Sequence, residues 1–214
     1  MKISNIGGAI EHWLGFQDKI GRSFMMNEDA LKYPLADYLV NAGNINVENI
    51  RLEYIHPNFS GRHVDLAIID NITAQINNIF ELKLAKPATK TQLEKQRIFN
   101  DLMRLYLANI TSTGKCYFII TGKTRDFQRY FYKFERNGSA FYKKWFAFGI
   151  GKEGSITFDV ATETDEDYQT IYQEFVREYA YQETLPAQIT TKCEFITAYD
   201  ERLIPYMAGI WSIS

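Results

Sequence analysis

The chain of 214 residues contains few of the residues that build disulfides or zinc sites: two cysteines and three histidines. Cys116 and Cys193 lie far apart in apolar, strand-like segments, so we expect buried free thiols and a reducing, cytoplasmic location. No cysteine or second histidine stands at metal-ligand spacing from His12 or His56, which disfavours zinc. Serine, cysteine and histidine form no recognisable catalytic triad, and acyl transfer is not expected.

Long apolar runs are also missing. No stretch reaches the about 18 apolar residues of a membrane span, and the first residues lack the basic-then-apolar pattern of a secretion signal. No repeat, linker or low-complexity tract is evident. With 46% hydrophobic and 15% aromatic residues, the chain can bury a full core. We expect one domain over residues 1–214, with a core at about 27–121 and a C-terminal extension at 122–214.

The net charge of −2 conceals an uneven distribution along the chain. From Lys83 to Lys144 there are 14 Lys and Arg against 4 Asp and Glu, whereas the remainder has 10 basic and 22 acidic residues. This +10 segment indicates a polyanionic partner, with counterion release as part of the driving force. The alternative is a set of ordinary solvated helix faces.

Hydrophobic periodicity predicts alternating strands and helices. The expected strands are 50–55, 64–70, 75–84, 115–121, 156–160, 190–198 and 206–212, and the expected helices are 89–109, 124–136 and 165–182. The first three strands indicate an antiparallel meander, and the largely apolar strand 115–121 should be central and parallel to the third. A further helix is expected from Asn27, where Pro34 either bends it or marks its true start.

Acidic residues interrupt two of the apolar strands. The strand expected at 64–70 carries Asp65, and the strand expected at 75–84 carries Glu81-Leu82-Lys83. Because strand side chains alternate, Glu81 and Lys83 share one face while Leu82 enters the core. If the strands pair, two carboxylates and an ammonium converge, which is the minimum needed to hold a divalent cation beside a water. A simple same-face ion pair is the alternative. Asp70, beside Asn71, is expected to be a turn residue.

This arrangement resembles the PD-(D/E)XK nuclease superfamily. Asp65 is followed, after 15 residues, by Glu81-Leu82-Lys83, then by a basic helix and another apolar strand. The run 101–105 in that helix is also similar, and the resemblance covers about residues 27–121. His63-Val64 precedes Asp65 where the family name has a proline. The resemblance implies an α/β, restriction-endonuclease-like fold with three layers: a mixed central sheet flanked by helices, with an extra C-terminal helix and strands.

The resemblance also implies roles for individual residues. Asp65, Glu81 and the Leu82 carbonyl would hold Mg²⁺, for which Mn²⁺ substitutes, and Lys83 would orient the attacking water. Glu28 would supply a further acid, with Asp37 or Glu11 as alternatives, and Gln96 is a further candidate. The basic residues expected to bind nucleic acid are Lys86, Lys90, Arg97, Arg104, Arg125, Arg129 and Lys133.

The sequence therefore predicts a magnesium-dependent nuclease that hydrolyses phosphodiester bonds, with DNA favoured as substrate. Cutting both strands of a duplex with one site per chain would favour a homodimer. Two other classes stay open: a non-catalytic nucleic-acid-binding module on the same fold, and a protein-interaction domain with an aromatic-rich surface.

Overall fold

A computed structural model describes residues 2–85, 92–108, 114–131, 141–147, 154–160, 166–179, 185–197 and 205–214. Its helices are α1 (Ile3–Lys19), α2 (Glu28–Asn41), α3 (Gln92–Leu107), α4 (Thr124–Phe131) and α5 (Glu166–Tyr179), with short 3₁₀ turns η1 (Ser23–Met25), η2 (Val47–Asn49) and η4 (Phe141–Lys144). Its strands are β1 (Ile50–Ile55), β2 (His63–Ile69), β3 (Ile76–Leu84), β4 (Lys115–Lys123), β5 (Ser155–Asp159), β6 (Gln188–Ile196) and β7 (Tyr206–Ile213).

The strands form one mixed sheet of seven in the order β1-β2-β3-β4-β7-β6-β5. β1, β2 and β3 make the predicted antiparallel meander. β3 and β4 are parallel, with α3 between them in the chain, whereas β4 pairs antiparallel with β7. The prediction of an α/β protein with a central fourth strand is confirmed, because β4 is the middle strand and is buried along most of its length.

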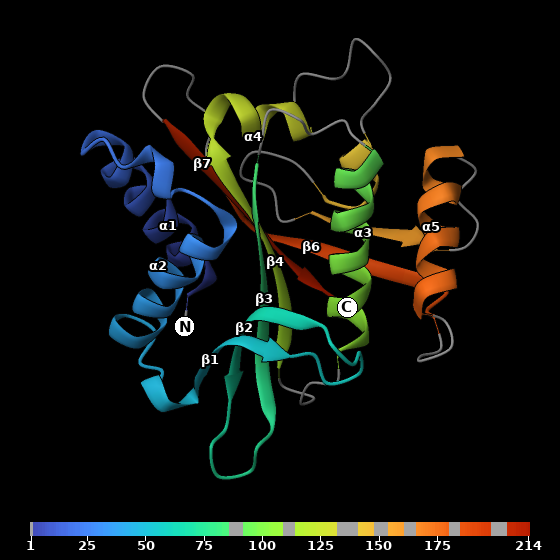
Figure 1. Cartoon of the computed structure of the whole chain (residues 1–214), viewed down its shortest axis with the longest axis horizontal. Helices are drawn as coiled ribbons and strands as arrows, with labels where there is room; N and C mark the ends of the chain where they lie inside the picture. The colour runs from blue at the N-terminus through green and yellow to red at the C-terminus, as the bar shows by residue number, and fades with distance from the viewer. Residues whose placement is uncertain are drawn as a thin grey trace.

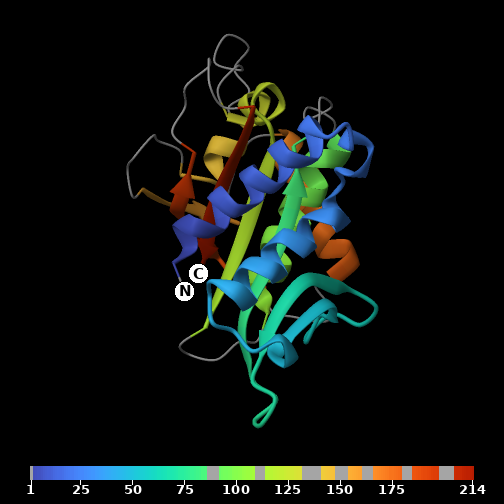
Figure 2. The same ribbon diagram turned by 90° about the vertical axis from the view of Figure 1, so that its left-hand side faces the viewer.

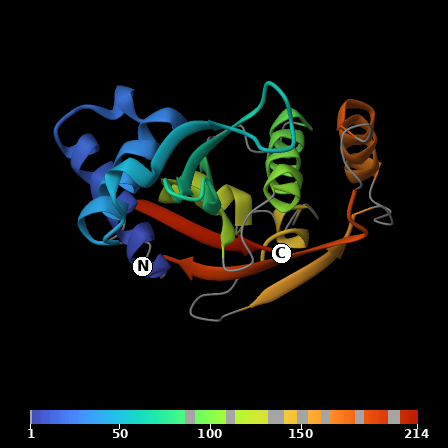
Figure 3. The same ribbon diagram turned by 90° about the horizontal axis from the view of Figure 1, so that it is seen from below.

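Helices cover both faces of this sheet, giving three layers (Figures 1 and 3). On one face, α1 and α2 lie side by side across the strands (Figure 2) and pack Leu14 and Leu35 against Phe80 and Ile119. On the other face, α3 and α5 pack with the opposite side of β3 and β4, including Ile79. Alternation along β3 therefore directs Phe80 and Leu82 towards α1 and α2, and Ile79 and Glu81 towards α3.

Helix α1 occupies a segment for which the sequence predicted no helix. Gly7 and Gly8 lower helix propensity and hide the pattern. Gly7 is nevertheless suited to its place, because a Cβ there would lie 2.0 Å from Cε1 of Phe195 on β6. A glycine thus lets the helix approach the sheet more closely than any other residue would allow.

Helix α2 runs without interruption from Glu28 to Asn41 and contains Pro34. The Asn27 side chain caps it by accepting a hydrogen bond from Ala30 N at 2.8 Å, as the sequence predicted. The alternative of a helix that begins at Pro34 is wrong. The first turn, which carries Glu28, therefore stays attached to a helix anchored in the core.

Other predictions hold with small shifts at the ends. The helices expected at 89–109, 124–136 and 165–182 are described over 92–107, 124–131 and 166–179; Ala108 is not helical, and the other remaining ends lie outside the described residues. Cys116 and Cys193 are buried free thiols, as expected. Among the described helices, none has the length and apolar character needed to cross a membrane.

Candidate active site

Asp65 lies where β2 and β3 separate. The last paired residues there are Leu66 and Phe80, so the same register places Asp65 opposite Glu81. In place of a further backbone pair, Asp65 Oδ2 accepts a hydrogen bond from Leu82 N at 2.7 Å. The Asp65 side chain is 20% exposed. A carboxylate from β2 is thus held against the backbone of the Glu-x-Lys segment.

Glu81 is buried, with 6% of its surface exposed. Burial raises its pKa well above the usual value, and the charges of Asp101 and Asp65 and a hydrogen bond with Asp65 raise it further. That bond requires a proton on one of the two carboxyl groups. Glu81 Oε1 has no hydrogen-bond partner among the described residues. The Arg104 guanidinium lies 3.9 Å from this oxygen, too far for a hydrogen bond.

Lys83 shares the α3-facing side of β3 with Glu81, as strand alternation predicted. Its Nζ lies 3.2 Å from Asp101 Oδ2 and 3.6 Å from Glu28 Oε2. Burial alone would lower the pKa of Lys83, but the Asp101 and Glu28 carboxylates outweigh it and raise the pKa. Lys83 is therefore a charged ammonium that joins β3, α3 and the first turn of α2.

Glu28 is the one of the three proposed helical acids that the structure brings to Lys83. Asp37 is exposed on the outer face of α2, where Asn41 Nδ2 donates to it at 2.8 Å. Glu11 lies on α1 and accepts a hydrogen bond from the Thr197 hydroxyl. Only the position directly after the Asn27 cap reaches the end of β3.

Asp65, Glu81, Lys83 and Glu28 form a charged cluster. Lys32 also belongs to this cluster, which the sequence did not indicate. Its side chain is 7% exposed, and its Nζ lies 2.8 Å from Asp29 Oδ1 and 3.5 Å from Asp65 Oδ1. It also pairs with Glu53, whose φ of +50° marks left-handed backbone within β1. Burial would lower the pKa of Lys32, whereas Asp29 and Asp65 raise it, with a net increase. The ammonium thus lies beside Oδ1 of Asp65, whereas Leu82 N donates to Oδ2.

Helix α3 contributes Asp101 and Arg104, which form an ion pair with each other. The expectation that Arg104 binds nucleic acid is not supported by its position, because its side chain is only 13% exposed and faces Asp101 and Glu81. Asp101 falls on the apolar stripe that includes Ile98 and Leu102, and an acid within such a stripe is the signal that could have identified it. Gln96 is half-buried and, five positions before Asp101, points about 140° away around the helix.

Other basic residues of the +10 segment differ in their exposure. Arg97 and Arg125 are exposed, as a surface role requires. The side chain of Arg129 and the whole of Lys86, Lys90 and Lys133 lie outside the described residues. Lys83 and Lys95 are 7% and 9% exposed, and Arg104 is similarly enclosed. The +10 segment therefore presents less positive charge to solvent than its composition indicates.

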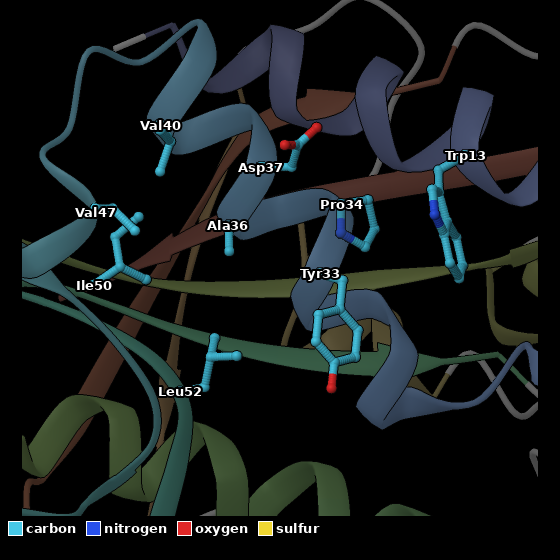
Figure 4. A pocket seen from close by; sticks show the side chains of 9 residues that line it. All are labelled: Trp13, Tyr33, Pro34, Ala36, Asp37, Val40, Val47, Ile50 and Leu52. Atoms are coloured by element: carbon cyan, nitrogen blue, oxygen red, sulfur yellow. The ribbon is translucent and has the colours of Figure 1, made fainter.

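A pocket of about 660 Å³ is lined by residues other than those of this charged cluster. It is bounded by Tyr33, Ala36 and Val40 of α2, which face Val47, Ile50 and Leu52, and by Trp13 of α1, beside Pro34 (Figure 4). Asp37 is the one charged residue among those described in its lining. None of the acids around Lys83 takes part in it.

The donor set of Asp65 and Glu81 fits a hard cation in one respect. Two carboxyl groups are in contact, and a buried oxygen of Glu81 lacks a partner, which is the environment that Mg²⁺ or Mn²⁺ would satisfy. No set of three or more Asp, Glu, His or Cys side chains within the described ranges is arranged to hold a metal. Further ligands would have to be backbone oxygens, such as the Leu82 carbonyl, and waters.

Comparison with known proteins adds no assignment. No family model, curated protein sequence or solved structure matches this chain.

Proposed function

We propose that the protein is a Mg²⁺-dependent nuclease that hydrolyses phosphodiester bonds in DNA. The observation that carries the proposal is the convergence of Asp65 and Glu81 from neighbouring strands, with Lys83 two residues after Glu81 and paired with Asp101, whose charge also acts on Glu81. Mutually repelling acids cost stability when they are buried together. A pair of acids buried at one end of a sheet is typical of a catalytic or metal-binding site.

Each residue has a role that its contacts support. Asp65, Glu81 and the Leu82 carbonyl would hold Mg²⁺, which when bound neutralises phosphate charge and lowers the pKa of a coordinated water. Lys83 would donate a hydrogen bond to the attacking water or to a phosphate oxygen. Asp101 and Glu28, at 3.2 Å and 3.6 Å from its Nζ, would keep that ammonium charged and fix its position.

The order of elements supports a restriction-endonuclease-like fold. Helix α2, the antiparallel strands β1, β2 and β3, helix α3 and the parallel strand β4 follow one another in the chain. The acid-bearing strand, the Glu-x-Lys strand, the helix and the apolar strand are thus in the order that the resemblance implies. The two free buried thiols support a reducing, cytoplasmic location, which we propose as well.

Three single variants test the proposal: Asp65→Asn, Glu81→Gln and Lys83→Met. Each should lower Mg²⁺-dependent cleavage of plasmid or oligonucleotide DNA by at least about 100-fold, because each removes a group that acts in the transition state. Asp37→Asn is the matched control, since it neutralises an exposed α2 acid outside the cluster. Circular dichroism would verify the fold of each variant. Undiminished cleavage by all three folded variants would contradict the assignment.

A second candidate function is a non-catalytic nucleic-acid-binding domain on the same fold. The observation that favours it is the position of the chain's own cations beside these acids, since Lys32 lies 3.5 Å from Asp65 and Arg104 lies 3.9 Å from Glu81. Magnesium titration separates the two functions. A binding domain would hold DNA equally well with Mg²⁺ or with EDTA, and would leave it uncut in both.

A further inference from the structure

An apolar surface lies between the end of α1 and the start of α2. Four large side chains there are exposed: Phe16 by 57%, Ile20 by 42%, Phe24 by 83% and Met25 by 45%. Single exposed apolar residues are common, but four within ten residues of chain are typical of a binding surface.

Positive charge borders the same surface. Lys19 and Arg22 are exposed within this segment, and Lys123 is exposed at the end of β4. The one acid between Phe16 and Met26 is Asp18, which accepts a hydrogen bond from the Ser23 hydroxyl at 2.6 Å. That bond ties η1 to the end of α1. The surface therefore combines exposed rings with basic side chains.

A pocket of about 450 Å³ adjoins this surface, between α1 and the start of β7. Its lining includes His12, Phe16 and Tyr206, together with the oppositely charged Glu11 and Lys19. A Cβ added at Gly15 would meet nothing within 4 Å, so this side of α1 is open. An aromatic-lined pocket that holds one ammonium and one carboxyl group suits a planar base.

The surface is also close to the charged cluster. Phe24 comes four residues before Glu28, whose carboxylate lies 3.6 Å from Lys83 Nζ. Four residues span at most about 14 Å, and one strand of stacked nucleotides advances by about 3.4 Å per nucleotide. The backbone positions of Phe24 and Glu28 are thus no farther apart than about four stacked nucleotides. Figure 2 shows the connection from α1 to α2 beside the end of β3.

We propose that the surface formed by Phe16, Lys19, Arg22 and Phe24 binds single-stranded nucleic acid next to the Asp65–Glu81 cluster. The two phenylalanine rings stack on bases, and the two basic side chains contact phosphates. The choice of substrate rests on the nuclease function proposed above. Bases inside a duplex stack on each other and cannot cover these rings, whereas an unpaired strand presents its base faces.

Binding in EDTA tests this proposal without cleavage. Fluorescence anisotropy with a labelled single-stranded oligodeoxynucleotide should give a Kd about tenfold weaker for Phe24→Leu than for the wild type, since stacking on an aromatic ring is lost while apolar surface is kept. Phe24→Tyr should restore the affinity. Ile72→Ala is the matched control, because Ile72 is 96% exposed on the β2–β3 turn. Arg22→Gln should reduce the salt dependence of binding.

The outcomes separate the two proposals. If Phe24→Leu and Ile72→Ala bind the oligonucleotide equally well, the surface assignment is overturned, even if the wild type cleaves DNA. If binding depends on Phe24 but Mg²⁺ brings no cleavage, the nuclease proposal fails and the surface assignment stands. If the wild type binds no oligonucleotide, or Phe24→Leu instead abolishes self-association or vesicle binding, the surface serves another partner and the assignment is wrong.

Discussion

Asp65 Oδ2 accepts a hydrogen bond from the backbone N–H of Leu82 at 2.7 Å. Leu82 lies between Glu81 and Lys83, so a single contact fixes the Asp65 carboxylate relative to both residues. The contact also replaces strand pairing beyond Leu66 and Phe80. The carboxylate therefore has a structural role in closing the end of the β2–β3 ladder as well as the proposed metal-binding role.

Two substitutions separate these roles of Asp65. Asp65→Asn keeps an oxygen that can accept from Leu82 N, so the free energy of unfolding should stay close to that of the wild type while cleavage is lost. Asp65→Ala leaves this N–H without an acceptor and should lower the free energy of unfolding by about 1–3 kcal/mol. Urea denaturation measures the difference. Equal stability of the two variants would show that the bond to Leu82 N contributes nothing.

Lys32→Met should destabilise the metal-free protein, because Asp29, Glu53 and Asp65 lose their shared cation. Breaking a fully buried pair costs about 3–5 kcal/mol, but the Asp29 and Glu53 side chains are 84% and 56% exposed. We therefore expect a loss of only about 1–2 kcal/mol in the free energy of unfolding.

Calcium provides a second measurement on the same variant. A divalent cation can replace the missing ammonium, so Ca²⁺ should raise the melting temperature of Lys32→Met more than that of the wild type. Lys2→Met, at an exposed position, is the control for removal of a lysine charge. An equal calcium effect on all three proteins would contradict a cation site at Asp65.

Two neighbouring glycines of α1 should respond oppositely to alanine. Gly7→Ala places a Cβ 2.0 Å from the Phe195 ring, whereas a Cβ at Gly8 meets nothing within 4 Å. Gly8→Ala should stabilise the protein by about 0.5–1 kcal/mol through helix propensity. Gly7→Ala should be less stable than Gly8→Ala by about 1–3 kcal/mol, because the helix or the ring must shift. Thermal denaturation of both variants checks this, and equal melting temperatures would show that α1 does not pack closely on β6.

Asp70 should contribute stability that depends on pH. Its Oδ1 accepts hydrogen bonds from Ile72 N and Thr73 N at 2.8 and 2.9 Å, and these bonds lower the pKa of Asp70 below its usual 3.8. The charged form is thus favoured by folding, so its contribution is complete above the unfolded pKa and is lost as the pH falls through the folded one.

Thermal denaturation of Asp70→Ala at pH 7 and at pH 2 checks the sign. The variant should melt below the wild type at pH 7, and the difference should shrink at pH 2. Asp70→Asn keeps a neutral acceptor and should lose less stability than Asp70→Ala at pH 7. A difference between wild type and Asp70→Ala that grows on acidification would contradict the assigned role.

Much of the strand arrangement could be predicted because side-chain alternation and turn formation depend on residues that are close together in the sequence. Alternation along β3 placed Glu81 and Lys83 on one face and Leu82 on the other, and turn chemistry at Asp70 indicated the hairpin. The Asn27 cap likewise needs only its own helix turn. Helix α1 escaped prediction because its glycines lower helix propensity, and Gly7 reflects contact with Phe195, a residue distant in the chain.

The composition of the charged cluster depended on tertiary structure. Lys32 of α2 and Glu53 of β1 come into contact only in the folded protein. Asp101 comes from α3, which follows β3 in the chain. An arginine on a helix can face solvent or pair with a buried acid, and the residue type is the same in both cases. The sequence therefore could not distinguish contact of Arg104 with nucleic acid from an internal ion pair. The sequence by itself determined which residues share a face of each strand. Packing of helices on both faces of the sheet decided which charges meet at the end of β3. Burial and charge pairing depend on distances between elements, and local propensity does not encode those distances.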